Sequence, residues 1–121
     1  MKLVHLTSTA DGGSRFGEME IPINAFPTPS GTVLNRSDVL PIVGSTVMEL
    51  PEGLIMDWHT SPRPSFVVVL SGVVESETSD GAKHSWGTGE MFFTDDREGR
   101  GHRTCTVDGP ARLLFLYPPN D

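Results

Sequence analysis

Glycine and proline interrupt this chain so often that few kinds of fold remain open to it. After residue 11, no stretch longer than nine residues lacks both of them. Both residues destabilise a helix interior, and helices of globular proteins average about 11–12 residues, so the spacing excludes an all-helical fold. The uninterrupted stretches are long enough for strands of about five or six residues. The sequence therefore predicts an all-β chain.

Short β-branched and aromatic stretches between these turns predict the strands. They cover residues 2–6, 18–23, 43–50, 54–59, 66–70, 73–78, 90–94, 102–107 and 112–117. Many short strands separated by such turns are typical of a β-sandwich or barrel. Two hairpins are predicted, one through Ser71-Gly72 and one through Asp80-Gly81. Residues 25–40, with prolines at 27 and 29, are predicted to form a loop that crosses the outside of the barrel.

Length and charge limit the class of protein. A chain of 121 residues is expected to form one domain over residues 1–121. Its net charge of −7 argues against a nucleic-acid partner, because nucleic-acid binding depends on clusters of lysine and arginine. No apolar stretch approaches the ~20 residues of a membrane span, so no membrane partner is expected. A single cysteine, Cys105, cannot form an internal disulfide, which favours a cytoplasmic location.

Two glycine and histidine spacings stand out. In the first, Gly53 is followed by five residues, then by His59, and Gly72 closes the segment. In the second, Gly89 opens the segment and His102 follows near its end. Together they resemble the two motifs of the cupin family, and the resemblance covers roughly residues 53–117.

The chain departs from the cupin pattern at several positions. Ser61 and Ser65 stand where the first motif has its second histidine and its glutamate. Asp95 and Thr106 stand at the proline and the asparagine of the second motif. Two extra residues separate Asp95 from Gly99. Because Ser61 and Ser65 replace metal ligands, these departures put a cupin metal site in this chain in doubt, whereas the glycine spacing still indicates the cupin fold.

The resemblance implies a double-stranded β-helix, a jelly-roll barrel whose small-molecule site lies in its mouth. It divides the domain into N-terminal strands with the crossing loop (1–40) and a barrel core (41–117). Cupins of this size are commonly homodimers in which an N-terminal strand crosses to the partner. Residues Glu18–Ile23 are predicted to be that strand.

Metal-binding cupins hold one ion with three histidines and one glutamate, and this chain keeps His59 and His102 of that set. If the strand stays extended, side-chain alternation places Asp57 on the same face as His59. The three side chains would then form a two-histidine, one-carboxylate site for a divalent metal such as Fe, Mn, Ni or Zn. The alternative is no cofactor, with the histidines held by hydrogen bonds to serine or threonine hydroxyls.

Other side chains are predicted to line or border the pocket. Ser61, Ser65 and Val67 should face the barrel interior, and Tyr117 could supply a hydroxyl. Arg63, held between two prolines, could bind a carboxylate or phosphate at the rim, or pair with Asp57 or Glu52 at the surface. The loop of residues 95–101 suits a mobile flap or an ordinary solvated loop equally well.

Two functional classes follow from these residues. One is a metal-assisted enzyme, an oxygenase, isomerase or cyclase, with His59 and His102 as catalytic residues and metal ligands. The other is a metal-free binding or sensing domain whose histidines hydrogen-bond a polar ligand. A metal-free enzyme that uses one histidine as a general base lies between them. The residues do not identify the ligand.

Overall fold

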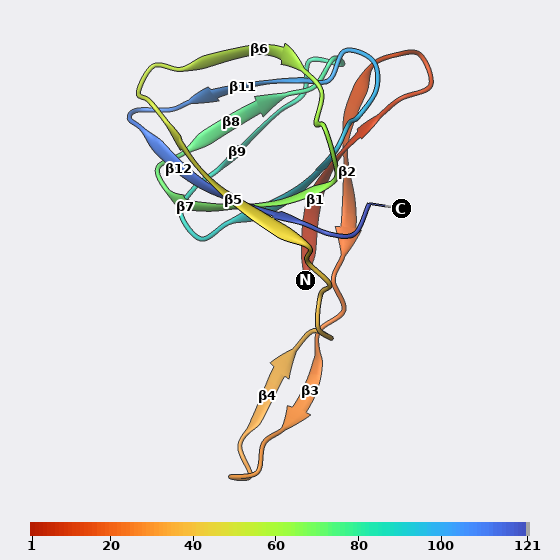
Figure 1. Cartoon of the computed structure of the whole chain (residues 1–121), viewed down its shortest axis with the longest axis vertical. Helices are drawn as coiled ribbons and strands as arrows, with labels where there is room; N and C mark the ends of the chain where they lie inside the picture. Colours follow the sequence, from red (N-terminus) through yellow and green to blue (C-terminus); the bar gives the residue numbers. More distant parts are fainter. Residues whose placement is uncertain (121) are drawn as a thin grey trace.

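A computed structural model describes residues 1–120 of the chain, and they form an all-β structure (Figure 1). Its strands are β1 (Lys2–Ser8), β2 (Ser14–Glu20), β3 (Asn24–Pro27), β4 (Val33–Arg36), β5 (Gly44–Leu50), β6 (Ile55–His59), β7 (Ser65–Ser71), β8 (Val74–Glu77), β9 (Lys83–Trp86), β10 (Met91–Asp95), β11 (His102–Thr106) and β12 (Ala111–Tyr117). Over these described residues no helix is long and apolar enough to cross a membrane.

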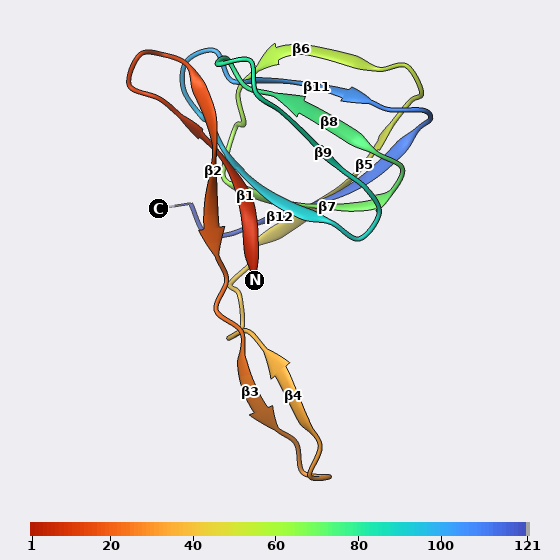
Figure 2. The same cartoon turned by 180° about the vertical axis from the view of Figure 1, so that it is seen from behind.

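Two sheets face each other to form the body of the molecule (Figures 1 and 2). The larger sheet has the order β2-β1-β10-β7-β12-β5, and the smaller sheet has the order β6-β11-β8-β9. All their pairs are antiparallel except the parallel pair β1–β10. This arrangement is a jelly roll, which confirms the predicted fold class.

Side-chain alternation on the central strands builds the core between the sheets. On β7, Val67 and Val69 are fully enclosed, whereas Leu70 points outward and is 42% exposed. Val74 on β8 and Trp86 on β9 meet them from the opposite sheet in one apolar cluster. Burial of these β-branched and aromatic side chains stabilises the barrel and fixes the register of its strands.

One predicted hairpin is confirmed and the other is wrong. β8 and β9 pair antiparallel around Asp80-Gly81, with Glu77 opposite Lys83. β7 and β8, however, belong to different sheets, so Ser71-Gly72 is a corner between sheets rather than a hairpin turn. Gly72 has a positive φ of 79°, and a Cβ there would overlap the carbonyl oxygen of Pro110. Only glycine combines this backbone conformation with so close an approach.

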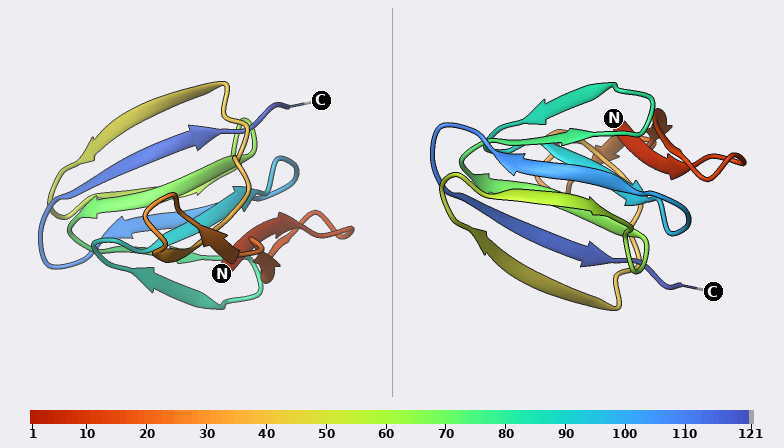
Figure 3. Two further views of the ribbon diagram at one scale, coloured as in Figure 1. Left: turned by 90° about the horizontal axis from the view of Figure 1, so that it is seen from below. Right: turned by 90° about the horizontal axis from the view of Figure 1, so that it is seen from above.

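The N-terminal third differs most from expectation. β2 pairs along its whole length with β1 of the same chain, from Lys2 opposite Glu20 to Ser8 opposite Ser14. Residues 18–20 of the predicted crossing strand thus pair within the chain, and β2 is the end strand of its sheet. Contact of Glu18–Ile23 with a partner stays a prediction. Residues 25–40 do not cross the barrel as predicted. β3 and β4 form a hairpin that projects from the body as an arm (Figures 1 and 2). Figure 3 shows the molecule along this direction, from below and from above. We call residues 22–43 the arm.

Candidate functional site

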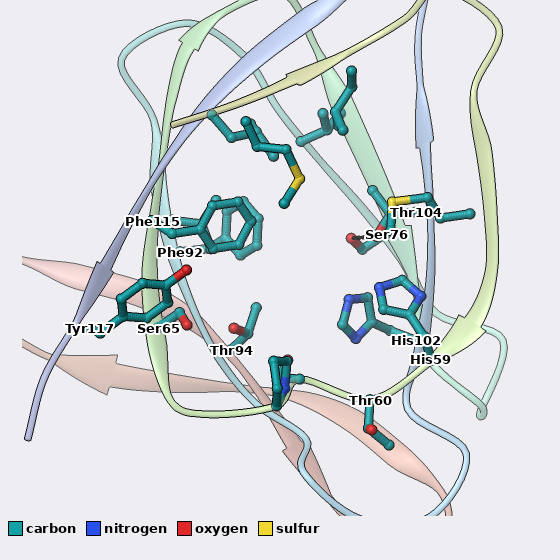
Figure 4. A pocket seen from close by; sticks show the side chains of 18 residues that line it. His59, Thr60, Ser65, Ser76, Phe92, Thr94, His102, Thr104, Phe115 and Tyr117 are labelled. Carbon is teal, nitrogen blue, oxygen red and sulfur yellow. Dashed lines mark hydrogen bonds between the residues drawn. The ribbon is translucent and has the colours of Figure 1, made fainter. Parts of the chain in front are cut away.

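A cavity of about 250 Å³ lies between the two sheets, inside the jelly roll. Its apolar wall comes mainly from the larger sheet and includes Leu50, Val67, Phe92, Leu113 and Phe115. Its polar wall is made largely by the smaller sheet and by the segment that follows β6. Figure 4 shows the imidazoles of His59 and His102 together on one side, and the rings of Phe92 and Phe115 on the other.

His59 and His102 meet in this cavity because β6 and β11 pair antiparallel with the two residues directly opposite. Their ring centroids lie 4.4 Å apart and the ring planes are inclined by 56°. His102 is buried, with 7% of its surface exposed, and His59 is partly buried. The two imidazoles, forty-three positions apart in the sequence, therefore lie next to each other in the cavity.

A buried carboxylate stands behind His102. Oδ2 of Asp96 lies 2.5 Å from Nδ1 of His102, and Oδ1 of Asp96 accepts a hydrogen bond from the Ser61 hydroxyl at 2.7 Å. The side chain of Asp96 is completely enclosed. The amide of Ser61 also donates to the backbone carbonyl of Asp96 at 3.1 Å. Burial of a carboxylate is costly unless charge-assisted hydrogen bonds satisfy it, and here Ser61 and His102 do so.

These contacts define the tautomer of both rings when they are neutral. An ionised carboxylate only accepts hydrogen bonds, so Nδ1 of His102 carries the proton and donates it to Asp96. Nδ1 of His59 lies 2.7 Å from the backbone carbonyl oxygen of Asp57, which also only accepts. In both rings the unprotonated nitrogen is therefore Nε2, and no described protein group forms a hydrogen bond with either Nε2.

Asp57 does not join the two histidines. Opposite the single residue Arg103 of β11, β6 carries two residues, Asp57 and Trp58, which is a β-bulge. The bulge breaks the alternation, so the cavity is lined by Met56 and His59 rather than by Asp57. The carboxylate of Asp57 is exposed and accepts a hydrogen bond from the Trp58 amide at 2.9 Å. The expectation that Asp57 faces inward with His59 is thus wrong.

The donor set does not fit the cupin metal site. Ser61 and Ser65 replace two of its four ligands, and the Ser61 hydroxyl is committed to Asp96. Asp57 points away, and in residues 1–120 no group of three or more histidine, cysteine, aspartate or glutamate side chains is placed to hold a metal ion. Two imidazole nitrogens alone fall short of the usual minimum of three protein ligands.

The remaining predicted pocket residues divide into two groups. Ser61, Ser65, Val67 and Tyr117 line the cavity. Arg63 is not part of the lining, and its guanidinium lies over the Tyr117 ring, 4.5 Å from the ring centroid. Among the described residues it forms no salt bridge with Asp57 or Glu52, so the predicted surface pair is wrong. Its binding of an anion at the rim stays a prediction.

The loop of residues 95–101 is fastened to the N-terminal hairpin rather than free to act as a flap. Ser8 exchanges two hydrogen bonds with the backbone of Glu98, both at 3.0 Å. The amide of Arg100 donates to Gly12 at 2.9 Å, and the Ser14 hydroxyl donates to Gly101 at 2.5 Å. Gly101 has a φ of 74°, and a Cβ there would overlap the carbonyl oxygen of His59. This close approach brings the loop, and with it Asp96, against β6.

Asp96 is the functional residue that the sequence did not single out. A signal for it exists in the alternation along β10, where Phe92 and Thr94 both face the cavity and Asp96 follows in the same phase. That phase could not be chosen from the sequence, because both faces of residues 90–93 carry apolar side chains. The direct neighbours Asp95 and Arg97 also made Asp96 look like part of a solvated loop.

Comparison with known proteins supports the fold and nothing finer. No protein-family model matches the chain, and no curated protein matches it. Among solved structures, the Cnp3 cupin domain of Schizosaccharomyces pombe covers 100% of this chain and 83% of its own length, at 12% identity and a TM-score of 0.52. The structure of the DMSP lyase DddQ from Ruegeria pomeroyi gives a TM-score of 0.55 at 21% identity, over 82% of this chain and 47% of that one.

The Clostridium difficile EutQ protein is a third neighbour, with a TM-score of 0.51 and 22% identity over 84% of this chain and 64% of its own. The chain thus spans about half of DddQ and less than two thirds of EutQ. At these identities the likeness defines the fold. The chain is a cupin-fold protein, and its predicted resemblance to cupins is confirmed at that level.

Proposed function

We propose that this protein binds a small molecule in the barrel cavity and catalyses proton transfer on it, as an isomerase or lyase does, with His102 as the general base. The observation that carries the proposal is the chain of contacts from Ser61 to Asp96 to His102. It ends at an imidazole nitrogen that faces the cavity without a protein partner. A buried aspartate that orients a histidine in this way is a recurring catalytic arrangement.

Each polar group has a distinct role in this proposal. Asp96 holds the Nδ1 proton of His102 and stabilises the imidazolium that forms when Nε2 takes a proton from the ligand. Ser61 keeps the carboxylate in position. The imidazolium of His102 then returns the proton to the ligand. His59, with its ring centroid 4.4 Å away, presents a second unprotonated Nε2, which accepts a hydrogen bond from a hydroxyl of the ligand. The reaction needs no further reactant, because one proton leaves and one returns.

A deuterium-exchange assay tests the catalytic role directly. 2-Indanone, a flat ketone with acidic protons beside its carbonyl, serves as the probe, and proton NMR in D₂O follows the loss of those protons. We expect the wild-type protein to accelerate exchange and His102→Ala to lower the rate by roughly a hundredfold. Asp96→Asn should lower it as well while the protein still binds the probe. His84→Ala, which changes an exposed histidine on β9, should leave the rate unaltered.

The second candidate function is ligand binding or sensing without catalysis. The enclosed apolar wall around Phe92 and Phe115 favours it, since such a surface binds a ligand whether or not a reaction follows. Equal exchange rates in the wild type, in His102→Ala and in buffer would contradict catalysis. Binding of 2-indanone in the same samples would then support the binding domain.

We also propose that the chain pairs with a second copy of itself. Ten of the thirteen large hydrophobic side chains exposed on the described surface lie between Ile23 and Met48, in the arm and β5. An isolated two-stranded hairpin is only marginally stable in water, so the arm needs a covering surface. The arm carries one arginine and one aspartate and is neutral overall, which favours another uncharged arm over a nucleic acid or an anionic membrane.

Light scattering coupled to gel filtration measures this assembly. A dimer that dissociates in the double variant Val33→Asp/Leu34→Asp would support the proposal, and a wild-type monomer at every concentration would contradict it.

We propose further that the protein resides in the cytoplasm. The ground is that the lone Cys105 has no disulfide partner within the chain. Cell fractionation with an antibody to the protein tests it.

A further inference from the structure

The cavity is polar at one end yet contains no charged side chain. None of the 18 residues that line it is a lysine, arginine, aspartate or glutamate. Three arginines are next in sequence to lining residues, but none belongs to the lining: Arg63, Arg103 and Arg112. With both imidazoles neutral, an anionic ligand would therefore leave water without meeting a counter-charge in the lining.

Asp96 strengthens this selection against anions. Its carboxylate is fully enclosed and lies directly behind His102, so it adds negative potential at the polar end of the cavity. Its two oxygens already accept hydrogen bonds from Ser61 and His102. A cationic ligand would thus face imidazoles and hydroxyls rather than a free carboxylate. Desolvation of either kind of ion in such a site costs several kcal/mol, roughly the scale for a buried charge that lacks a partner.

Most hydroxyls of the lining are already used within the protein. Ser76 and Thr104 bond to each other at 3.1 Å, and the Tyr117 hydroxyl donates to Thr46 at 2.9 Å. The groups left for a ligand are concentrated at Nε2 of His59 and of His102. A ligand that satisfies them needs one polar group at that end and an apolar body elsewhere.

The opposite wall fits an apolar, flat body. The rings of Phe92 and Phe115 lie across the cavity from the imidazoles in Figure 4, so a ligand between them is enclosed by aromatic faces. The volume of about 250 Å³ equals the liquid volume of roughly eight water molecules. This space accepts a molecular body of roughly ten non-hydrogen atoms.

We infer that the ligand of this cavity is a small uncharged molecule with a flat, largely apolar body and a single hydroxyl group, which donates a hydrogen bond to Nε2 of His59 or of His102. Carboxylates, phosphates and ammonium compounds are excluded as ligand classes. The placement of the hydroxyl rests on the tautomers of the two imidazoles, the reaction of this ligand rests on the proposed function, and the exclusion of ions rests on the lining.

Three compounds with the same indane skeleton separate charge from shape. They are 2-indanol, which is neutral, indane-2-carboxylate, which is an anion, and 2-aminoindane, which is a cation at neutral pH. Titrations followed by the imidazole proton signals of His59 and His102 give the three affinities. We expect 2-indanol to bind at least about tenfold more tightly than either ion, a difference of about 1.4 kcal/mol. Equal or tighter binding of either ion, or no shift of these signals by 2-indanol, would overturn the inference.

A paired substitution on β5 provides a matched control. Met48 lines the cavity and is 36% exposed, whereas its neighbour Val47 is 60% exposed and does not line it. Met48→Lys should gain affinity for indane-2-carboxylate because it adds a cation to the lining, and Val47→Lys should not. Equal affinities in the two variants, with folding verified by circular dichroism, would contradict the assignment of the lining.

The outcomes for ligand and reaction are separable. Binding of 2-indanol without accelerated exchange of 2-indanone would retain the ligand class and remove the proposed catalysis. Preferred binding of the carboxylate together with exchange that depends on His102 would remove the ligand class and retain the proton transfer.

Discussion

The loop of residues 95–101 and the arm of residues 22–43 are both long connections between strands of the barrel, yet they are held in opposite ways. The loop is bonded to Ser8, Gly12 and Ser14 of the N-terminal hairpin, and it carries the enclosed Asp96. Within the described chain, the hydrogen bonds of residues 24–38 stay inside the arm. Its large side chains, such as Val33 and Val39, are 59% and 85% exposed.

This contrast teaches where sequence composition misleads. The loop is rich in charge and glycine, which suggests mobility, but its backbone is satisfied by neighbours and its glycines permit close approach. The arm is rich in apolar residues, which suggests a buried segment, but nothing within residues 1–120 covers it. The loop shapes a site, and the arm offers a surface. Three paired substitutions test this distinction, each with one member in or beside the loop and one comparison in the arm, and a single substitution at His5 tests a pH dependence.

The largest difference is expected between Gly101→Ala and Gly31→Ala. Both glycines have positive φ, 74° and 90°, so both variants strain the backbone. A Cβ at Gly101 also overlaps the carbonyl of His59, while a Cβ at Gly31 meets nothing within 4 Å. Urea denaturation should show a loss of about 4 kcal/mol or a complete failure to fold at Gly101, and about 1 kcal/mol at Gly31. Equal losses would mean that the close approach is absent in solution.

The next difference is expected between Asp96→Ala and Asp38→Ala. Removal of the buried carboxylate leaves the Ser61 hydroxyl and Nδ1 of His102 without an acceptor, which should lower the free energy of unfolding by about 3 kcal/mol. Asp38 is exposed in the arm, and its loss should cost less than about 0.5 kcal/mol. Chemical denaturation of both variants measures these values. A small effect at Asp96 would contradict its role as the anchor of His102.

A smaller difference separates Ser14→Ala from Ser30→Ala. The Ser14 hydroxyl donates to the Gly101 carbonyl and accepts from the Ser79 amide at 3.0 Å in a buried setting. Its removal should cost about 1–2 kcal/mol, because a buried carbonyl and amide lose their partner. Ser30 bonds only to Thr28 at the exposed tip of the arm, so its removal should be nearly neutral. Thermal melts of the two variants under the same conditions check the order.

The smallest effect is a pH dependence confined to the body. Burial lowers the pKa of His5, and the nearby Asp95 opposes this only in part. Nε2 of His5 is enclosed without a hydrogen-bond partner. The unfolded chain therefore takes up a proton at His5 more readily than the folded chain, and the free energy of unfolding falls as the pH decreases below about 6.5. His5→Leu should flatten this slope, and an unchanged slope would contradict it. The arm contains no histidine.

Most of the strands could be predicted from the sequence because their alternation and their turn residues act locally. The connections that pass from one sheet to the other could not be predicted, because Ser71-Gly72 fits a hairpin turn and a corner between sheets equally well. The choice is made by the packing of Gly72 against Pro110, which are far apart in the sequence. The arm escaped prediction for a similar reason, as Phe26 and Leu34 give a hairpin pattern only after the pairing partner is known.

The candidate site was predictable in its two histidines and not in its carboxylate. The spacing of His59 and His102 after their glycines carried over from the cupin pattern to the structure. Asp57 was chosen because a regular strand alternates, and a bulge is invisible to that rule. The true partner, Asp96, lies just past β10, where strand alternation no longer gives a firm direction.

The bulge at Asp57 and Trp58 changes which side chains of β6 face the cavity. A single substitution on β6 could therefore add a ligand beside the two histidines. Position 56, opposite Thr104, is the one that faces the cavity beside His59. A carboxylate introduced there, as in Met56→Asp, would complete a two-histidine, one-carboxylate set without any change of backbone. Uptake of Co²⁺ by that variant, followed by its visible absorption, would reveal it. One amino-acid change thus separates this barrel from a candidate metal site. Insertion or loss of one residue in β6 would change which positions of the strand face the cavity.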